Sequence, residues 1–251
     1  MYICVCRLLE SVKEYGAKVT DVSCGSEHTL ILTDDGEVLS CGVGEYGRLG
    51  AGMSKDLYIP SSLDSLDNVK IVQVAAGTNH SMALSADGHV YSWGRNDAGQ
   101  LGFADTYIDI YSMEEYPRMI ETESFEGKKI VHIAASNCRS AAVTEDGKLY
   151  IWGRKQNHYP TLIATSDEFV ENTFVKKVVL GRDSSDHFCG FVLDDNSAVW
   201  SYGEYKTNML GHAAAPKSGL SPTKIKTLEG QRVLDIAAGV GHCAAVVETS
   251  D

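Results

Sequence analysis

The sequence predicts an all-β fold, a β-propeller of four-stranded antiparallel blades, and three observations lead to it. One turn motif, Ala-Gly-Thr-Asn-His at residues 76–80, recurs with variations at residues 24–28, 135–139, 180–187 and 238–242. A spacing of roughly 50 residues indicates an array of like modules. The shift that places His28 on His80 also places Gly36 on Gly88 without a gap, and each copy carries four short strand patterns. Wedges of this kind pack side by side around an axis.

The second copy shows the expected elements in order. Residues 72–75 are small and β-branched, which suits a buried first strand (A) near the axis, and Gly77 lets the chain turn tightly after it. Strand B covers residues 81–84 and strand C residues 90–93. The Asp-Gly pair at 87–88 favours a type I′ hairpin between them, and similar pairs stand at 35–36, 146–147 and 195–196. Strand D begins near Pro117, because an edge strand tolerates a residue that cannot donate to the ladder.

The residue near the end of strand C is predicted to fill the space between neighbouring blades. It is Trp93, Trp152 and Tyr202 in three copies and Cys41 in the first. The loop after strand C carries Leu101, which we expect beneath its blade. Repetition from end to end indicates one domain. Its modules are residues 1–18 (partial), 19–68, 69–127, 128–172, 173–230 and 231–251 (partial).

Composition argues against two classes of partner. The 34 acidic and 22 basic side chains leave a net charge of −12, which opposes direct nucleic-acid binding because that binding needs Lys and Arg to neutralise phosphates. No apolar run is long enough to span a bilayer, so no membrane partner is expected. Three of the seven cysteines, Cys24, Cys41 and Cys189, fall on predicted strands. We expect them to be small, reduced core residues, which predicts a cytoplasmic or nuclear protein.

The sequence gives little support to enzyme chemistry. It contains no Cys-x-x-Cys pair, Gly-x-Ser-x-Gly elbow, P-loop or His-Glu-x-x-His motif. The paired acids at 34–35 and 145–146 fall in hairpin turns, where they shape the backbone. We therefore expect no conventional catalytic residues, no metal site and no cofactor.

Residues 71–119 carry the motif Val-Ala-Ala-Gly-x-x-His, then Asp-Gly-x-Val-Tyr-Ser-Trp-Gly-x-Asn-x-x-Gly-Gln-Leu-Gly, then Pro. This motif closely resembles the repeat of the regulator of chromosome condensation (RCC1-type) family, and the resemblance covers nearly the whole chain. It implies a propeller of seven blades in which the two chain ends complete one blade. Residues 233–238 and 242–247 match the final A and B strands, whereas residues 6–12 match only a D strand. We therefore expect about four full blades with a partial blade at each end.

Three explanations of the missing strands remain open. The chain is a shortened gene product or gene model, or an open arc that another chain completes, or a five-bladed ring whose last blade joins residues 233–247 with residues 6–12. We expect the shortened or the open form. An open arc exposes strand edges unless self-association or another chain covers them.

In a propeller the A-to-B turns gather at one mouth of the axial channel, so the turn residues should share one face. The resemblance extends to an exchange factor for the Ran GTPase and implies partner contacts at the matching positions, which are Glu27, His28, Asn79, His80, Asp183 and His242. The alternative is that each turn histidine bonds neighbouring backbone and holds the turn shape. Arg139 replaces one turn histidine, and the longer fourth turn leaves the register of His187 open.

The longest connection between strands C and D covers residues 103–116. It contains Tyr107, Tyr111, Glu114 and Glu115, and tyrosines beside acids suit a basic protein surface. The alternative is an ordinary solvated insertion.

Two hypotheses of function follow, and a fragment without activity of its own remains a third outcome. The first is a protein–protein interaction scaffold that binds a protein partner through the turns and the long loop. The alternative is a guanine-nucleotide exchange factor for a small Ran-like GTPase, which displaces nucleotide without covalent chemistry. Light sensing in a relative of this family depends on a Gly-Trp-Arg-His-Thr motif, which is absent here.

Overall fold

The computed structural model describes residues 16, 18–104, 108–154, 157–163, 169, 173–181, 188–204, 210–212, 221–239 and 242–248. In this part of the chain the strands form four antiparallel sheets of four strands and one sheet of two. The strands are β1 (Val19–Cys24), β2 (His28–Thr33), β3 (Val38–Gly42), β4 (Leu57–Ser62), β5 (Ile71–Ala76), β6 (His80–Ser85), β7 (Val90–Arg95), β8 (Met113–Met119), β9 (Ile130–Ala135), β10 (Arg139–Thr144), β11 (Leu149–Gly153), β12 (Asn157–Leu162), β13 (Val175–Leu180), β14 (Phe188–Asp194), β15 (Val199–Glu204), β16 (Thr223–Lys224), β17 (Val233–Ala238) and β18 (Cys243–Val247). Short 3₁₀ helices lie at η1 (Glu45–Gly47), η2 (Asp64–Leu66), η3 (Thr122–Phe125) and η5 (Lys226–Leu228). The predicted all-β fold is confirmed.

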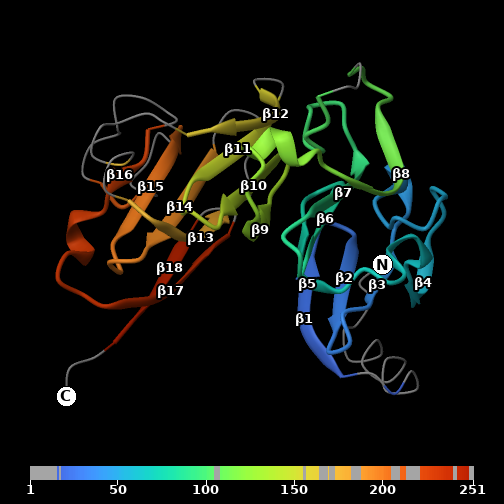
Figure 1. Cartoon of the computed structure of the whole chain (residues 1–251), viewed down its shortest axis with the longest axis horizontal. Helices are drawn as coiled ribbons and strands as arrows, with labels where there is room; N and C mark the ends of the chain where they lie inside the picture. Colours follow the sequence, from blue (N-terminus) through green and yellow to red (C-terminus); the bar gives the residue numbers. More distant parts are fainter. Residues whose placement is uncertain are drawn as a thin grey trace.

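The sheets follow one another along an arc, with β1 near one end and β17–β18 at the other (Figure 1). Each later sheet packs its first strand against the first two strands of the sheet before it, as β5 does on β1 and β2. This is the blade packing of a β-propeller, which is incomplete relative to seven blades. The strand predicted at residues 6–12 lies outside the described residues.

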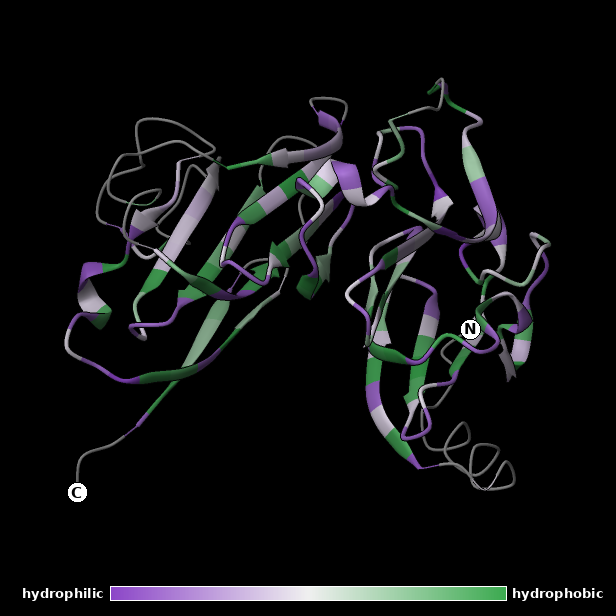
Figure 2. Cartoon of the chain, in the orientation of Figure 1, coloured by the Kyte–Doolittle hydropathy of each residue, from purple (hydrophilic) through white to green (hydrophobic). Residues whose placement is uncertain are grey.

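The core lies between neighbouring sheets. Trp93, Trp152 and Tyr202 are completely buried and pack against the preceding sheet, as predicted. Leu101 is also completely buried. Figure 2 shows the hydrophobic residues concentrated on the strands and the hydrophilic ones in the connecting segments. None of the helices in the described part of the chain is long and apolar enough to cross a membrane.

The hairpins between the second and third strands differ from the predicted type. Gly36, Gly88 and Gly147 have positive φ angles of 92°, 87° and 78°, but the aspartates before them do not. In the first hairpin the N–H of Gly36 donates to the carbonyl of Thr33 at 3.1 Å. These are three-residue loops, each a turn followed by one left-handed residue, so the type I′ prediction was wrong.

Two other expectations also need correction. Strand D of the second sheet, β8, begins at Met113 rather than near Pro117, because Met113 already pairs with Arg95 of β7. Cys24 is exposed and borders the axial cavity described below, whereas Cys41 and Cys189 are buried as expected. Burial, reinforced by the neighbouring Cys24, raises the pKa of the Cys41 thiol to about 11.

Candidate functional site

The turns after the first strands and the loops after the third strands lie on one face of the molecule. The N–H of Val43 donates to the carbonyl of Glu27 at 2.8 Å, and the N–H of Arg95 donates to Asn79 at 2.9 Å. The same bond recurs in the third sheet. We call this surface the turn face; it comprises residues 25–27, 77–79, 136–138, 239 and 242 of the turns and residues 43–56, 96–104 and 108–112 of the loops.

The turns converge on an axial cavity of about 360 Å³. All five sheets line it, with Ser26, Thr78, Asn137, Leu180 and Gly239 as representatives. The described lining contains no histidine and no carboxylate, and its polar side chains are hydroxyls, the Asn137 amide and the Cys24 thiol. Within the described ranges, no group of three or more His, Cys, Asp or Glu is placed to hold a metal ion.

His28 joins the first sheet to the second inside the molecule. Its side chain is buried, and its Nε2 lies 2.9 Å from Ser81 Oγ. The Ser81 hydroxyl gives its single proton to the carbonyl of Arg48 at 2.8 Å, so Nε2–H of His28 is the donor to Ser81. Trp93 Nε1 donates to the same carbonyl at 3.1 Å. Burial, with the charge of Arg48 and the neighbouring His80, lowers the pKa of His28 to about 3.

His80 repeats this arrangement at the next junction. Its Nε2 lies 2.9 Å from Ser140 Oγ, and Ser140 donates to the carbonyl of Gln100 at 2.7 Å. Trp152 Nε1 donates to the same carbonyl at 3.0 Å. Burial lowers the pKa of His80 to about 4. Both histidines therefore act as neutral links between sheets, and neither ring lies on the surface. The sequence did not lead us to expect these serine partners. A serine nevertheless directly follows the turn residue in two copies, as Ser81 and Ser140.

The next junction uses a different contact. Arg139 stands at the turn-histidine position, and its guanidinium carbon lies 3.8 Å from the centroid of the Phe188 ring, a cation–π contact between sheets. In the fourth sheet Cys189 pairs with Gly203 as His80 pairs with Gly94. Cys189, and not His187, therefore matches the turn histidines.

Glu27 is exposed on the turn face and is held by a buried arginine. Arg48, 1% exposed in its side chain, makes ion pairs of 3.2 Å with Glu27 and 3.1 Å with Glu45. Both carboxylate side chains are 59% exposed. The Tyr46 ring lies beside them, with its centroid 4.6 Å from the guanidinium carbon of Arg95. The arginine thus fixes two carboxylates that face solvent.

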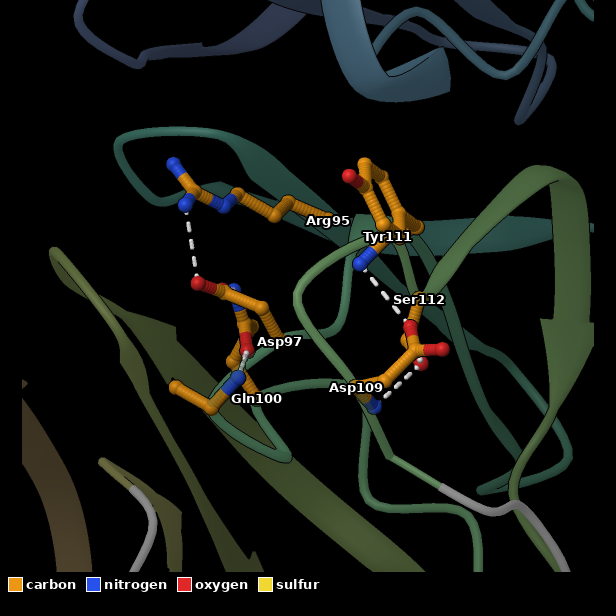
Figure 3. Close-up of polar contacts among 7 residues, drawn as sticks. Arg95, Asp97, Gln100, Asp109, Tyr111 and Ser112 are labelled. Carbon is orange, nitrogen blue, oxygen red and sulfur yellow. Dashed lines mark hydrogen bonds and ion pairs between the residues drawn. The ribbon is translucent and has the colours of Figure 1, made fainter.

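Tyr111 is presented by a tight turn at residues 109–112, which Figure 3 shows beside Arg95 and Asp97. Asp109 Oδ1 accepts a hydrogen bond from the N–H of Tyr111 at 2.8 Å, and the N–H of Asp109 donates to Ser112 Oγ at 2.8 Å. Tyr111 is 80% exposed. Near the end of β7, Arg95 and Asp97 form an ion pair of 2.8 Å. The turn at residues 109–112 is therefore internally bonded and presents an exposed aromatic ring.

Glu114 and Glu115 lie on β8 rather than in the loop. Glu114 pairs with Arg118 at 3.2 Å, and Glu115 Oε1 accepts a hydrogen bond from Ser54 at 3.3 Å. Since Gly52 donates its N–H to the carbonyl of Glu115 at 3.0 Å, β8 joins the loop of the first sheet. We call the resulting surface the loop patch. It comprises Met53, Ile110, Tyr111, Met113, Glu114, Glu115 and Tyr116.

Besides Tyr111, Glu114 and Glu115 of the loop patch, the predicted site residues divide into three groups. Glu27 and His242 are exposed on the turn face, and Asn79 is half-buried there. His28 and His80 are buried between sheets. Asp183 and Tyr107 lie outside the described residues.

Comparison with known proteins points to one family. The family model described as the RCC1-like domain matches residues 5–251. The ultraviolet-B receptor UVR8 of Arabidopsis thaliana is 35% identical over 241 residues, which cover 94% of this chain and 52% of UVR8. The chain thus spans about half the length of that relative.

Solved structures show the same fold. Human WBSCR16 matches with a TM-score of 0.78 and 25% identity, over 93% of this chain and 58% of that one. Saccharomyces cerevisiae Prp20p, whose structure was described with its binding to Gsp1p and histones, matches with a TM-score of 0.75 and 20% identity, over 94% of this chain and 57% of that one.

Proposed function

Because the chain belongs to the RCC1-like domain family, we propose that it is a protein–protein interaction scaffold whose partner binds the turn face and the loop patch. We propose the cytoplasm or the nucleus as its compartment. The most direct support is the Tyr111 turn. The Tyr111 side chain is 80% exposed, and its backbone is fixed by the bond from its N–H to the Asp109 carboxylate, so less backbone entropy is lost when a partner covers the turn. Tyrosine is also favoured in the buried centres of interfaces.

The surrounding charges indicate the chemistry of the partner. Glu27 and Glu45 present exposed carboxylates on the turn face, and Asp109 lies beside Tyr111. The net charge of −12 adds a long-range negative field. We therefore propose a partner with a basic surface, which this field attracts and orients.

Substitution of the loop patch tests the proposal. The immobilised protein and its variants are incubated with cell extract, and the captured proteins are identified and quantified by mass spectrometry. We expect Tyr111→Ala, and separately the double reversal Glu114→Lys with Glu115→Lys, to reduce capture of a specific partner about tenfold or more. Tyr159→Ala is the matched control for the tyrosine, because Tyr159 is an exposed tyrosine on the third sheet.

Glu145→Lys is the matched control for the reversal, because Glu145 lies in the hairpin at the opposite ends of the strands. Thermal melts must show that each variant is folded. Capture that is unchanged by both loop-patch variants, or lost equally in the controls, would reject the proposed surface.

Guanine-nucleotide exchange on a small Ran-like GTPase is the second proposal, and it draws on the fold shared with Prp20p. Its contacts would come from the exposed turn residues Glu27 and His242, since the rings of His28 and His80 are buried. Stopped-flow release of fluorescent GDP from Ran tests it. Acceleration that is lost in Glu27→Ala and His242→Ala would support exchange. No acceleration over the spontaneous rate would reject it and leave the scaffold proposal standing.

A further inference from the structure

The methionines in the described part of the chain differ sharply in exposure. Met53, Met113 and Met119 are 49%, 45% and 43% exposed, whereas Met82 is completely buried. Methionine is among the residues most often fully buried in folded proteins. The three exposed thioethers lie on only two segments, the loop of the first sheet and the strand β8.

Two of these methionines belong to the loop patch and lie close to one carboxylate. Met53 stands between Gly52, whose N–H donates to the carbonyl of Glu115 at 3.0 Å, and Ser54, whose hydroxyl donates to Glu115 Oε1 at 3.3 Å. Met113 lies two residues before Glu115 on β8. These bonds hold two segments together and place both methionine residues next to Glu115.

Met119 offers a matched comparison on the same strand. It is exposed to nearly the same extent as Met113, but it pairs with Tyr91, whereas Met113 pairs with Arg95 at the other end of the ladder. The two ends of this seven-residue strand lie roughly 20 Å apart. Met119 is therefore an exposed methionine outside the loop patch.

We propose that Met53 and Met113 are oxidation sites at which hydrogen peroxide switches off partner binding by the loop patch. One peroxide oxygen is transferred to the thioether sulfur: the O–O bond breaks, an S–O bond forms, the sulfur loses two electrons, and the peroxide is reduced to water. Methionine sulfoxide reductases reverse the change at the expense of a thiol reductant. This inference rests on the proposed function, because its consequence is a loss of binding at the same patch.

The free protein tolerates the added oxygen, whereas a bound partner does not. Both side chains have about half of their surface in solvent, so a sulfoxide oxygen at either position stays hydrated. When a partner covers the patch, that oxygen loses its water, and the apolar contact of the thioether is lost as well. We therefore expect oxidation to weaken binding about fivefold or more without unfolding the chain.

The charge of this surface favours an uncharged oxidant. Glu114 and Glu115 follow Met113 directly on β8, and the chain carries a net charge of −12. The resulting negative field repels anionic oxidants, whereas it does not repel hydrogen peroxide. A neutral peroxide is thus the class of oxidant that this patch admits.

Peptide mapping by mass spectrometry tests the sites themselves. The folded 251-residue protein is treated with hydrogen peroxide, and catalase ends the reaction before digestion. We expect sulfoxide to form at Met53 and Met113 at least about tenfold faster than at Met82, which its burial protects, and at Met119 as fast as at Met113. Thermal melts should be the same before and after treatment. Oxidation of Met53 and Met113 no faster than that of Met82 would overturn the inference.

Capture from cell extract tests the consequence. The immobilised protein is oxidised and treated with catalase before the extract is added, and the protein quantified is the partner whose capture Tyr111→Ala reduces. Capture by the wild type should fall about fivefold or more and should recover after treatment with methionine sulfoxide reductases. The double variant Met53→Leu with Met113→Leu conserves volume and should keep its capture after peroxide. Met119→Leu should lose capture as the wild type does.

The outcomes separate this inference from the proposed function. An untreated wild type that captures no such partner would reject the proposed function and this inference with it. Capture that persists when Met53 and Met113 are both oxidised would overturn the inference alone. A loss of capture as large in the double leucine variant would do the same, because the oxidised group would then lie elsewhere.

Discussion

At the scale of single residues, the turn histidines show that one repeated position can be buried or exposed. His28 and His80 donate to serine hydroxyls of the next sheet, whereas His242 is exposed at the end of the arc. In each case the serine donates to a backbone carbonyl that also accepts a hydrogen bond from a tryptophan, and we call this histidine–serine–carbonyl chain the relay. Because all these groups are out of contact with water, each bond that is lost leaves an unsatisfied polar atom.

The hydroxyl of Ser140 is therefore expected to contribute strongly to stability. Ser140→Ala removes both the acceptor for His80 and the donor to Gln100. We expect the free energy of unfolding to fall by about 1–3 kcal/mol in urea denaturation. Ser61→Ala, on the outer strand β4, serves as the control and should change it by less than about 0.5 kcal/mol. If the two substitutions lower the free energy of unfolding equally, the buried bonds of Ser140 contribute no more to stability than Ser61 does.

The same histidines make stability depend on pH. Their pKa values, about 3 for His28 and about 4 for His80, lie below the 6.5 of an unfolded chain. Between pH 6.5 and 4 the unfolded state therefore binds protons that the folded state does not, and the free energy of unfolding falls as the pH falls. We expect a loss of roughly 1–2 kcal/mol for each histidine between pH 7 and pH 5.

Comparison of the wild type with His80→Gln isolates the contribution of one ring, since all other groups titrate alike. The loss of stability between pH 7 and pH 5 should be smaller in the variant by the amount assigned to His80. If the two proteins lose the same free energy, His80 does not titrate as its burial predicts.

At the scale of elements, the loop of the first sheet and β8 of the second depend on close contact at Gly52. Its φ is +73°, and a Cβ added there would meet the ring of Tyr116. Gly52→Ala should reduce the free energy of unfolding by about 2 kcal/mol or more, from backbone strain together with the clash.

Two controls separate these causes. Gly230 has a φ of +80° with nothing near its Cβ direction, so Gly230→Ala should cost only the backbone strain, about 1 kcal/mol. Adding Tyr116→Ala to Gly52→Ala should recover part of the loss by removing the clash. Thermal denaturation of the single and double variants measures both terms. Equal costs at Gly52 and Gly230 would mean that Tyr116 yields without penalty.

At the scale of the whole molecule, protection should vary along the arc. Strands such as β6 and β10 are buried between sheets, whereas β18 is largely exposed. We expect the amides of β17 and β18 to exchange with deuterium well before those of β6 and β10. Hydrogen–deuterium exchange with mass spectrometry resolves these peptides. Uniform protection from β6 to β18 would mean that the arc opens as one cooperative unit.

The predictability of these features follows from the range of the interactions behind them. The strands, the glycines of the first three hairpins and the buried Trp93 and Trp152 could be predicted because side-chain alternation, turn chemistry and the repeat spacing are local properties of the sequence. The start of β8 at Met113 could not, because its ladder with β7 extends past Pro117 into a segment with no strand signal of its own.

The sequence by itself thus determined the fold class and the positions that each module contributes to a junction. Only the tertiary structure decided which histidines are structural and which is exposed. The partner of His28 is Ser81 and the partner of His80 is Ser140, in both cases a residue of the following sheet. Whether a turn histidine is buried therefore depends on the presence of a neighbouring sheet, which no local pattern encodes.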